Sequence, residues 1–118
     1  MIDSFPLLKN ISFPSIERNQ LKTLQLNLGY RCNLQCNHCH VGASPYRTEV
    51  MSENTLEDVI TFVKKYQIKQ VDLTGGAPEL HPQFLYLVKQ LSNLDCEVLL
   101  RSNLSVLQLP DYNYLMDE

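Results

Sequence analysis

The chain has 118 residues, 44% of them hydrophobic, which is enough for one small domain but not for a full enzyme barrel of about 250 residues. Its net charge is −3 and its lysines and arginines are scattered, so the sequence argues against nucleic-acid binding. Its start has no basic stretch followed by a long apolar run, and no window reaches membrane-spanning length, which predicts a soluble, cytoplasmic protein without membrane contact.

The predicted elements alternate between strands and helices. Residues 1–20 are expected to be an irregular lead-in, 21–107 a folded core, and 108–118 a tail, with weak structure from residue 104 onward. Strands are predicted within 23–30, 70–76 and 96–104, and helices within 51–68 and 80–95. The third strand is an almost continuous apolar run, which is typical of a strand buried on both faces.

Both helical segments carry local signals for where they begin. Ser52 or Asn54 can cap the first helix, because these side chains accept a backbone N–H at a helix start. Pro82 suits the first turn of the second helix, and His81 before it is expected to be a helix-entry residue. Cys96, which opens the third strand, is expected to be an inert core thiol.

Strands that alternate with helices predict an α/β fold with a parallel sheet and right-handed crossovers. A cysteine-rich run follows the first strand, and the pair Gly75–Gly76 follows the second. Both therefore fall at the carboxyl edge of the sheet, where folds of this class place their sites.

The run RCNLQCNHCH, residues 31–40, holds three of the four cysteines and two of the three histidines. In a reducing compartment, clustered cysteines are metal ligands or redox groups more often than disulfides. The residues allow three sites: covalent haem on Cys36 and Cys39 with His40, zinc on three thiolates with His38 or His40, or an iron–sulfur cluster on Cys32, Cys36 and Cys39.

The spacing of the cysteines favours the iron–sulfur cluster. Haem attachment leaves Cys32 unused and needs an export route, and structural zinc sites usually draw two pairs of ligands from separate loops. Three thiolates on one loop can instead ligate three irons of a [4Fe-4S] cube and leave the fourth iron open. A zinc- or haem-binding module without catalysis remains the alternative.

The spacing Cys32-x3-Cys36-x2-Cys39 resembles the cluster motif of the radical S-adenosylmethionine (radical SAM) enzymes. The resemblance implies that these cysteines hold a [4Fe-4S] cluster and that S-adenosylmethionine (SAM) chelates its open iron. It also implies that His38 lies near the cofactor, at a position that is commonly aromatic in the family.

The stretch LTGGAPEL resembles the family's glycine-glycine-glutamate segment, which binds the methionine amino group largely through backbone carbonyls. Gly75 and Gly76 match it, Ala77 stands where glutamate is usual, and Glu79 follows two residues later. Glycine suits such a segment because it lets the backbone approach a ligand closely.

Two polar residues end the third predicted strand at the same edge. Arg101 could pair with the methionine carboxylate and Asn103 could hydrogen-bond the ribose, although polar strand ends are also common without any ligand. Ser102 stands between them, where relatives tend to carry a cysteine, so a thiol role at that position is in doubt.

Residues 24–49 and 71–90 resemble the arsenosugar-biosynthesis branch of these enzymes. That resemblance implies reductive cleavage of SAM to a 5′-deoxyadenosyl radical that attacks a methylated trivalent arsenical, with an electron donor such as a flavodoxin or ferredoxin. Members of the branch are much longer, so the implied fold is the N-terminal part, about three β/α units, of a partial (β/α)6 TIM-type barrel. Such a chain would be a truncated reading frame, a fragment completed by a second chain, or a remnant that binds a cluster without turnover.

Overall fold

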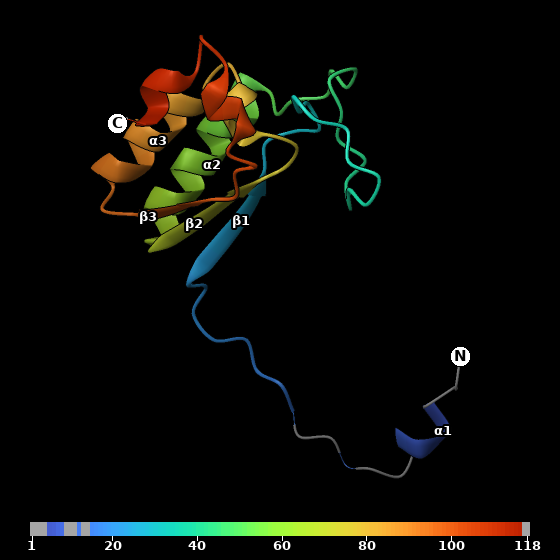
Figure 1. Cartoon of the computed structure of the whole chain (residues 1–118). Helices are drawn as coiled ribbons and strands as arrows, with labels where there is room; N and C mark the ends of the chain where they lie inside the picture. The colour runs from blue at the N-terminus through green and yellow to red at the C-terminus, as the bar shows by residue number, and fades with distance from the viewer. Residues whose placement is uncertain (1–4, 9–11, 13–14, 117–118) are drawn as a thin grey trace.

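The computed structural model of the protein describes residues 5–8, 12 and 15–116. A one-turn helix, α1 (Phe5–Leu8), stands apart from the folded part, and residues 15–22 run exposed and without regular structure toward the first strand (Figure 1). The described part of the predicted lead-in is therefore irregular apart from α1. The remaining positions of that lead-in, and residues 117–118 of the predicted tail, lie outside the described residues.

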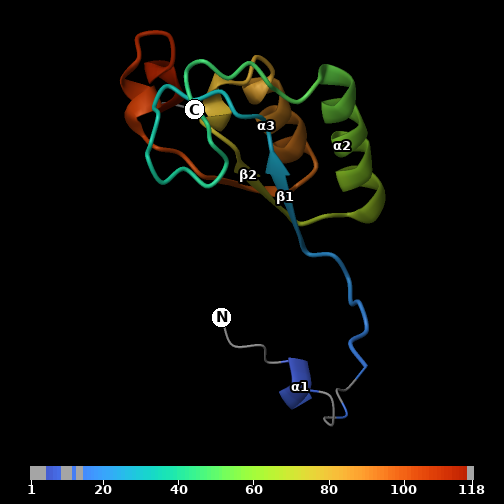
Figure 2. The same ribbon diagram turned by 90° about the vertical axis from the view of Figure 1, so that its right-hand side faces the viewer.

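Three parallel strands form the sheet: β1 (Thr23–Asn27), β2 (Gln70–Thr74) and β3 (Glu97–Leu100), in that order. The helix α2 (Glu53–Tyr66) connects β1 to β2, and α3 (Phe84–Asn93) connects β2 to β3. Figures 1 and 2 show both helices on the same face of the sheet. The predicted alternation, the parallel sheet and all five predicted elements are confirmed.

The core lies between this face of the sheet and the two helices. Alternate strand residues such as Leu26, Val71 and Leu73 point into it, and α2 and α3 supply Leu56 and Leu87. Each of these side chains contributes about 1.5–3 kcal/mol when it is fully buried. The apolar side chains that recur along the strands and along the helices therefore pack into one apolar layer. This layer holds the carboxyl ends of the strands in place. Cys96, predicted to be a core thiol, also packs there, and burial raises its pKa.

The opposite face of the sheet carries mostly polar side chains, and no helix of the described residues covers it (Figure 2). Hydrogen bonds run across it from Thr23 to Gln70 and from Gln70 to Glu97. The prediction that the third strand is buried on both faces is wrong, because Leu99 and Leu100 are 42% and 40% exposed. The physical reason is that β3 is an edge strand in the described part of the chain.

The segment after β3 is more ordered than predicted. It forms two 3₁₀ helices, η2 (Ser105–Gln108) and η3 (Asn113–Met116), and the side chain of Val106 is fully buried. Val106 packs with Cys32 and Leu80 in a second apolar cluster below the cysteine run. The prediction of weak structure from residue 104 is therefore wrong for this part, because Val106 anchors the segment by its contacts.

The entry to α3 differs in detail from the prediction. A short 3₁₀ helix, η1 (Pro78–Leu80), precedes it, and α3 begins at Phe84, so Pro82 lies before the helix rather than in its first turn. His81 acts at the entry as predicted: its Nδ1 accepts the Gln83 N–H at 3.1 Å, so its Nε2 donates to the Met51 carbonyl at 2.8 Å. None of the helices in the described ranges has the length and apolar character that crossing a membrane requires.

We expect Ser52→Ala to lower the free energy of unfolding by about 1 kcal/mol. The Ser52 side chain caps α2 by accepting the Thr55 N–H at 3.2 Å, whereas Asn54 lies inside the helix. Asn54→Ala is the matched control and should change stability by less than about 0.5 kcal/mol. Urea denaturation of both variants tests this; a larger loss for Asn54→Ala would show that Asn54 provides the cap.

Candidate functional site

The segments that follow β1 and β2 lie side by side at the carboxyl edge of the sheet. The backbone N–H of Gly76 donates to the carbonyl of Gly29 at 3.0 Å, and the N–H of Ala77 donates to the carbonyl of Arg31 at 3.0 Å. These bonds extend the parallel pairing beyond the strands, so the cysteine run and the glycine pair share one edge, as predicted.

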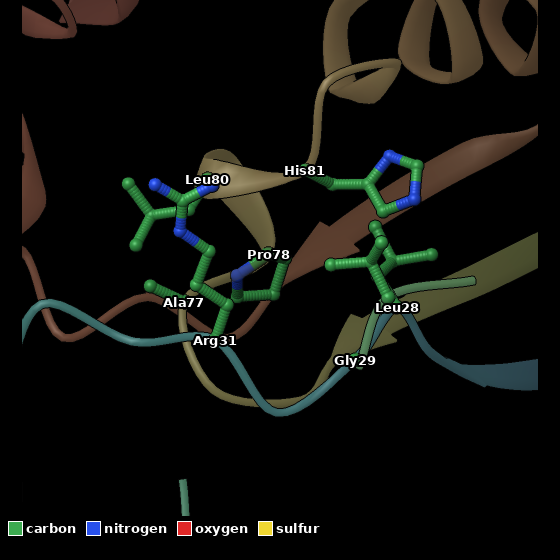
Figure 3. Close-up of a pocket in the computed structure, with 8 residues that line it drawn as sticks. Leu28, Gly29, Arg31, Ala77, Pro78, Leu80 and His81 are labelled. Carbon is green, nitrogen blue, oxygen red and sulfur yellow. The ribbon is translucent and has the colours of Figure 1, made fainter. Parts of the chain in front are cut away.

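Glycine is required at both positions of the pair by this packing. At Gly75 φ is +138°, and a Cβ there would lie 2.6 Å from the carbonyl oxygen of Gly29. At Gly76 a Cβ would clash with the carbonyl of Arg31. Figure 3 shows Ala77 and Pro78 facing Arg31 and Gly29 around a hollow of about 10 Å³, which is room for about one water molecule. The glycines thus allow two loops to pack closely.

The glycine pair also offers two backbone carbonyl oxygens as hydrogen-bond acceptors. Among the described residues, the carbonyls of Gly75 and Gly76 accept no backbone hydrogen bond, whereas the carbonyl of Thr74 accepts the Leu28 N–H at 2.9 Å. Free carbonyl oxygens are what the resemblance predicts for binding an ammonium group. That role of the glycine pair stays a prediction.

The three cysteines of the run occupy different environments. Cys32 is buried, Cys36 is exposed and Cys39 is half-buried. The sulfur of Cys32 accepts the Leu34 N–H at 3.4 Å, and the sulfur of Cys39 accepts the Ala43 N–H at 3.3 Å. Backbone hydrogen bonds from residues 41–43 lower the pKa of Cys39, that from Ala43 contributing most. They stabilise the thiolate, which is the form that binds metals.

The donor set fits an iron–sulfur cluster by its chemistry, because three thiols from one loop are soft ligands and two of them already receive N–H donors. In residues 5–8, 12 and 15–116, no three His, Cys, Asp or Glu side chains are gathered around a point that could hold a single metal ion. A [4Fe-4S] cluster takes its three thiolates on three different iron atoms, so the cluster ligand set stays a prediction.

The two histidines of the run are exposed loop residues. The structure records no hydrogen bond to the side chain of His38 or His40 in the part of the chain that it describes. The predicted position of His38 beside the cofactor is therefore neither supported nor opposed by its contacts.

Asn103 ties the segment after β3 to the cysteine run. Its amide donates to Asn33 Oδ1 at 2.9 Å and to the sulfur of Cys32 at 3.5 Å, and its own Oδ1 accepts from Ser105 Oγ at 3.0 Å. The predicted contact with a ribose stays a prediction. Sequence reasoning missed Asn33, and its position beside Cys32 was the available signal.

Arg101 forms an ion pair with Asp72 on the open face of the sheet. Its Nε and Nη2 lie 2.7–3.1 Å from the two carboxylate oxygens, and this bidentate contact lowers the pKa of Asp72. Gln25 donates to the same carboxylate at 3.3 Å. The predicted contact of Arg101 with a methionine carboxylate remains a prediction, and it would compete with Asp72.

The stabilising effect of Asp72 over Asp72→Asn should fade in acid. Since the folded-state pKa of Asp72 is below its ordinary value of 3.8, the carboxylate stabilises the fold above that value. As the pH falls below 3.8, the carboxylate of Asp72 takes up a proton only by weakening its ion pair with Arg101. The extra stability of the wild type over Asp72→Asn is then lost. Urea denaturation of both proteins at several pH values tests this; a difference that grows toward low pH would contradict it.

Arg47 belongs to the stretch on which the arsenosugar resemblance rests, but the sequence reasoning assigned it no role. It forms a bidentate ion pair with Glu49 at 2.9–3.0 Å, donates to the carbonyl of Gly42 at 3.1 Å and lies over the ring of Tyr30. The contact with Arg47 lowers the pKa of Glu49 to about 2. Arg47 thereby holds in place the segment that follows the cysteine run. In the sequence, the spacing of Arg47 and Glu49 two residues apart was the signal for this ion pair.

The side chain of Glu79 is buried beside α3 and the segment after β3. It is 2% exposed and lines two hollows between α3 and the segment after β3, and none of the three cysteines lines either hollow. Ala77, in contrast, packs with Cys32 and Ala43. The structure therefore brings the glycine pair, Ala77 and Asn103 to the cysteine run, and the predicted role of Glu79 at the cofactor stays a prediction.

These features define an α/β protein whose thiol-bearing loop and glycine-rich turn share the carboxyl edge of a parallel sheet. The family model of the radical SAM superfamily matches residues 26–116. The chain belongs to the radical SAM superfamily. The match also includes most of the segment predicted to be a tail.

Curated relatives match part of the chain at moderate identity. YydG of Bacillus subtilis, named for peptide biosynthesis, is 37% identical over 65 residues, which are 54% of this chain and 20% of YydG. GTP 3′,8-cyclase of Aquifex aeolicus is 28% identical over 64% of this chain and 25% of its own length. 7-Carboxy-7-deazaguanine synthase of Clostridium acetobutylicum is 32% identical over 68% of this chain and 38% of its own length. The chain thus spans between a fifth and two fifths of these relatives.

Proposed function

We propose that the protein is the N-terminal part of a radical SAM enzyme that holds a [4Fe-4S] cluster on Cys32, Cys36 and Cys39 and binds SAM beside it. The observation that carries the proposal is that backbone hydrogen bonds from Gly76 to Gly29 and from Ala77 to Arg31 hold the glycine turn beside the start of the cysteine run at one sheet edge. Membership of the superfamily supports the same chemistry. When bound, the cluster supplies the electron that splits a carbon–sulfur bond of SAM.

The chain's own groups bind and orient the cofactor. The carbonyl oxygens of Gly75 and Gly76 accept from the methionine ammonium, while His38 packs beside the adenine. The N–H groups around Cys39 and the amide of Asn103 at Cys32 hold the thiolate charge. In this proposal Arg101 would turn from Asp72 toward the methionine carboxylate. Protein groups thus supply position and charge, and the cofactors supply the reactive chemistry.

We further propose that the substrate is a methylated trivalent arsenical, as in arsenosugar biosynthesis. The support is the resemblance of residues 24–49 and 71–90 to that branch, including the Arg47–Glu49 pair, whose contacts close the cysteine loop. The relatives' names point to several different reactions, so they give no substrate for this chain. Turnover of SAM that depends on an added methylated trivalent arsenical would support this substrate, and turnover without it would oppose it.

We also propose that further polypeptide completes a partial (β/α)6 barrel beyond β3, supplied by a second chain. The exposed Leu99 and Leu100 of the edge strand and the short span of the relatives that is covered support this. A flavodoxin or ferredoxin is the proposed electron donor. Alone, the 118-residue chain is expected to bind the cluster without arsenic-dependent turnover.

The decisive experiment is anaerobic reconstitution with iron and sulfide, followed by electron paramagnetic resonance of the reduced protein with and without SAM. A [4Fe-4S]⁺ signal that shifts on adding SAM is expected. An assembled cluster whose signal does not respond would overturn SAM binding by this chain. A colourless protein that takes up zinc, or a red one with a sharp Soret band, would overturn the iron–sulfur assignment in favour of the alternative module.

A further inference from the structure

Tyr46 exposes its ring to solvent on a turn that is itself firmly anchored. Its side chain is 84% exposed, the highest value among the large hydrophobic side chains of the described residues. The turn is fixed through Ser44, which is buried and whose N–H donates to the carbonyl of Tyr30 at 3.2 Å. The hydroxyl of Ser44 accepts the Tyr46 N–H at 3.3 Å, and its carbonyl accepts the Arg47 N–H at 3.2 Å. The anchored turn therefore keeps an aromatic ring in water, where it gains nothing from burial.

The surroundings of Tyr46 combine apolar and cationic side chains. A hollow of about 330 Å³ beside it is lined by Arg31, Pro45, Arg47, Thr48, Val50 and Pro82. Arg47 is paired with Glu49, whereas the structure records no hydrogen bond or ion pair for the side chain of Arg31 within the described ranges. We call Tyr46 and the residues that line this hollow the Tyr46 surface.

The Tyr46 surface is positively charged in a chain whose net charge is −3. Residues 28–50 contain the two arginines, Arg31 and Arg47, and Glu49 as the one acidic residue. Tyrosine and arginine are the residue types that anchor many contacts between proteins. An exposed ring next to an unpaired arginine is therefore complementary to a partner with an acidic surface.

The Tyr46 surface is continuous with the cysteine run. Arg31 directly precedes Cys32 in the chain, and the Cys32 N–H donates to the carbonyl of Ser44 at 3.2 Å. The Ala43 N–H donates to the sulfur of Cys39 at 3.3 Å. A partner seated on Tyr46 is thus connected to two of the proposed cluster ligands through short paths. Electron-transfer complexes bury less than about 1,200 Å², so a surface of modest size is sufficient for one.

We propose that the Tyr46 surface docks an acidic electron-transfer protein, with the ring of Tyr46 as the apolar anchor and Arg31 as the free charge. The inference rests on the proposed function, because a donor is needed only if the chain holds a cluster. The donor gives up one electron, which the cluster takes up, and no bond forms or breaks between the two proteins. Binding should weaken as the salt concentration rises, because salt screens exposed charges.

Calorimetric titration of the cluster-free chain with an acidic flavodoxin in its oxidised form tests docking without any redox step. Tyr46→Ala should weaken binding about tenfold, as the loss of an interface anchor does. Arg31→Gln should weaken binding less and make it depend less on salt. Tyr66→Ala and Lys65→Gln are matched controls, because they remove an exposed ring and an exposed cation from the last turn of α2, at the opposite edge of the sheet. Both controls should bind as the wild type does, and circular dichroism confirms that each variant is folded.

Stopped-flow reduction of the reconstituted chain provides the second readout. Tyr46→Ala should slow reduction by reduced flavodoxin and leave reduction by dithionite, which needs no docking, unchanged. The absence of flavodoxin binding by the wild type, or equal losses in Tyr46→Ala and Tyr66→Ala, would overturn the proposal. Self-association in sedimentation that Tyr46→Ala abolishes would assign the surface to a second copy of the chain instead. Failure to assemble a cluster would overturn the proposed function and the inference with it, whereas an assembled cluster that flavodoxin reduces equally well in Tyr46→Ala would overturn the docking surface alone.

Discussion

Cys36→Ala should abolish assembly of the [4Fe-4S] cluster on the reconstituted chain. The cluster needs three thiolates, and the loop offers Cys32, Cys36 and Cys39 with no other cysteine nearby in sequence. Because Cys36 is exposed, its replacement should change the free energy of unfolding by less than about 0.5 kcal/mol. Iron and sulfide analysis, with the broad absorption near about 400 nm that is typical of such clusters, measures the outcome.

Cys96→Ala is the matched control for this experiment. Cys96 is the remaining cysteine, is buried in the core between the sheet and the helices, and has its pKa raised by burial. Its loss should reduce stability by about 1 kcal/mol and leave the iron content unchanged. If Cys36→Ala retained a full complement of iron, or Cys96→Ala lost it, the proposed ligand set would be wrong.

Gly76→Ala should be among the most destabilising single substitutions in the chain, with a loss of about 3 kcal/mol. Its Cβ would clash with the backbone carbonyl of Arg31, which cannot rotate away as a side chain could. Relief requires the two loops to separate, which stretches the hydrogen bond from the Ala77 N–H to the same carbonyl. The variant should also assemble less cluster, since that contact holds the glycine turn against the cysteine run.

Gly42→Ala provides the comparison. Gly42 has φ of +61°, so alanine there carries a conformational cost of about 1–2 kcal/mol, but its Cβ would meet only the Arg47 side chain at 3.7 Å. Urea denaturation of both variants should therefore give a clearly larger loss for Gly76→Ala. A loss no greater than that of Gly42→Ala would mean that the two loops can separate without harm to the fold.

Local patterns were sufficient for the elements and for the cysteine motif. Leu56 and Val63 recur at helical spacing, and Val71 and Leu73 alternate, so the residues that reach the core could be read along the chain. The order of strands and helices then predicted the parallel sheet and the edge shared by the cysteine run and Gly75–Gly76. Errors arose where burial depends on distant neighbours, as at the exposed β3 and at the buried Val106.

The roles of individual polar residues could not be predicted in the same way. Arg101 was expected at a ligand, and the structure pairs it with Asp72, which is 29 residues earlier in the chain. Asn103 was expected at a ribose, and it contacts Asn33, which is 70 residues earlier. Such partners follow from strand register and loop packing, which no local pattern contains.

By itself the amino-acid sequence determined the class of fold and the core residues, and it contains the cysteine motif from which the thiol ligand set is predicted, because hydrophobic periodicity and a contiguous motif are local properties. Only the tertiary structure decided why Gly75 and Gly76 must be glycine, which donors reach Cys32 and Cys39, and that the carboxylate of Glu79 is buried without a hydrogen-bond partner among the described residues. These contacts depend on how segments far apart in the chain meet. The energies of the hydrogen bonds and of the steric contacts depend on distances and directions that exist only in the folded chain.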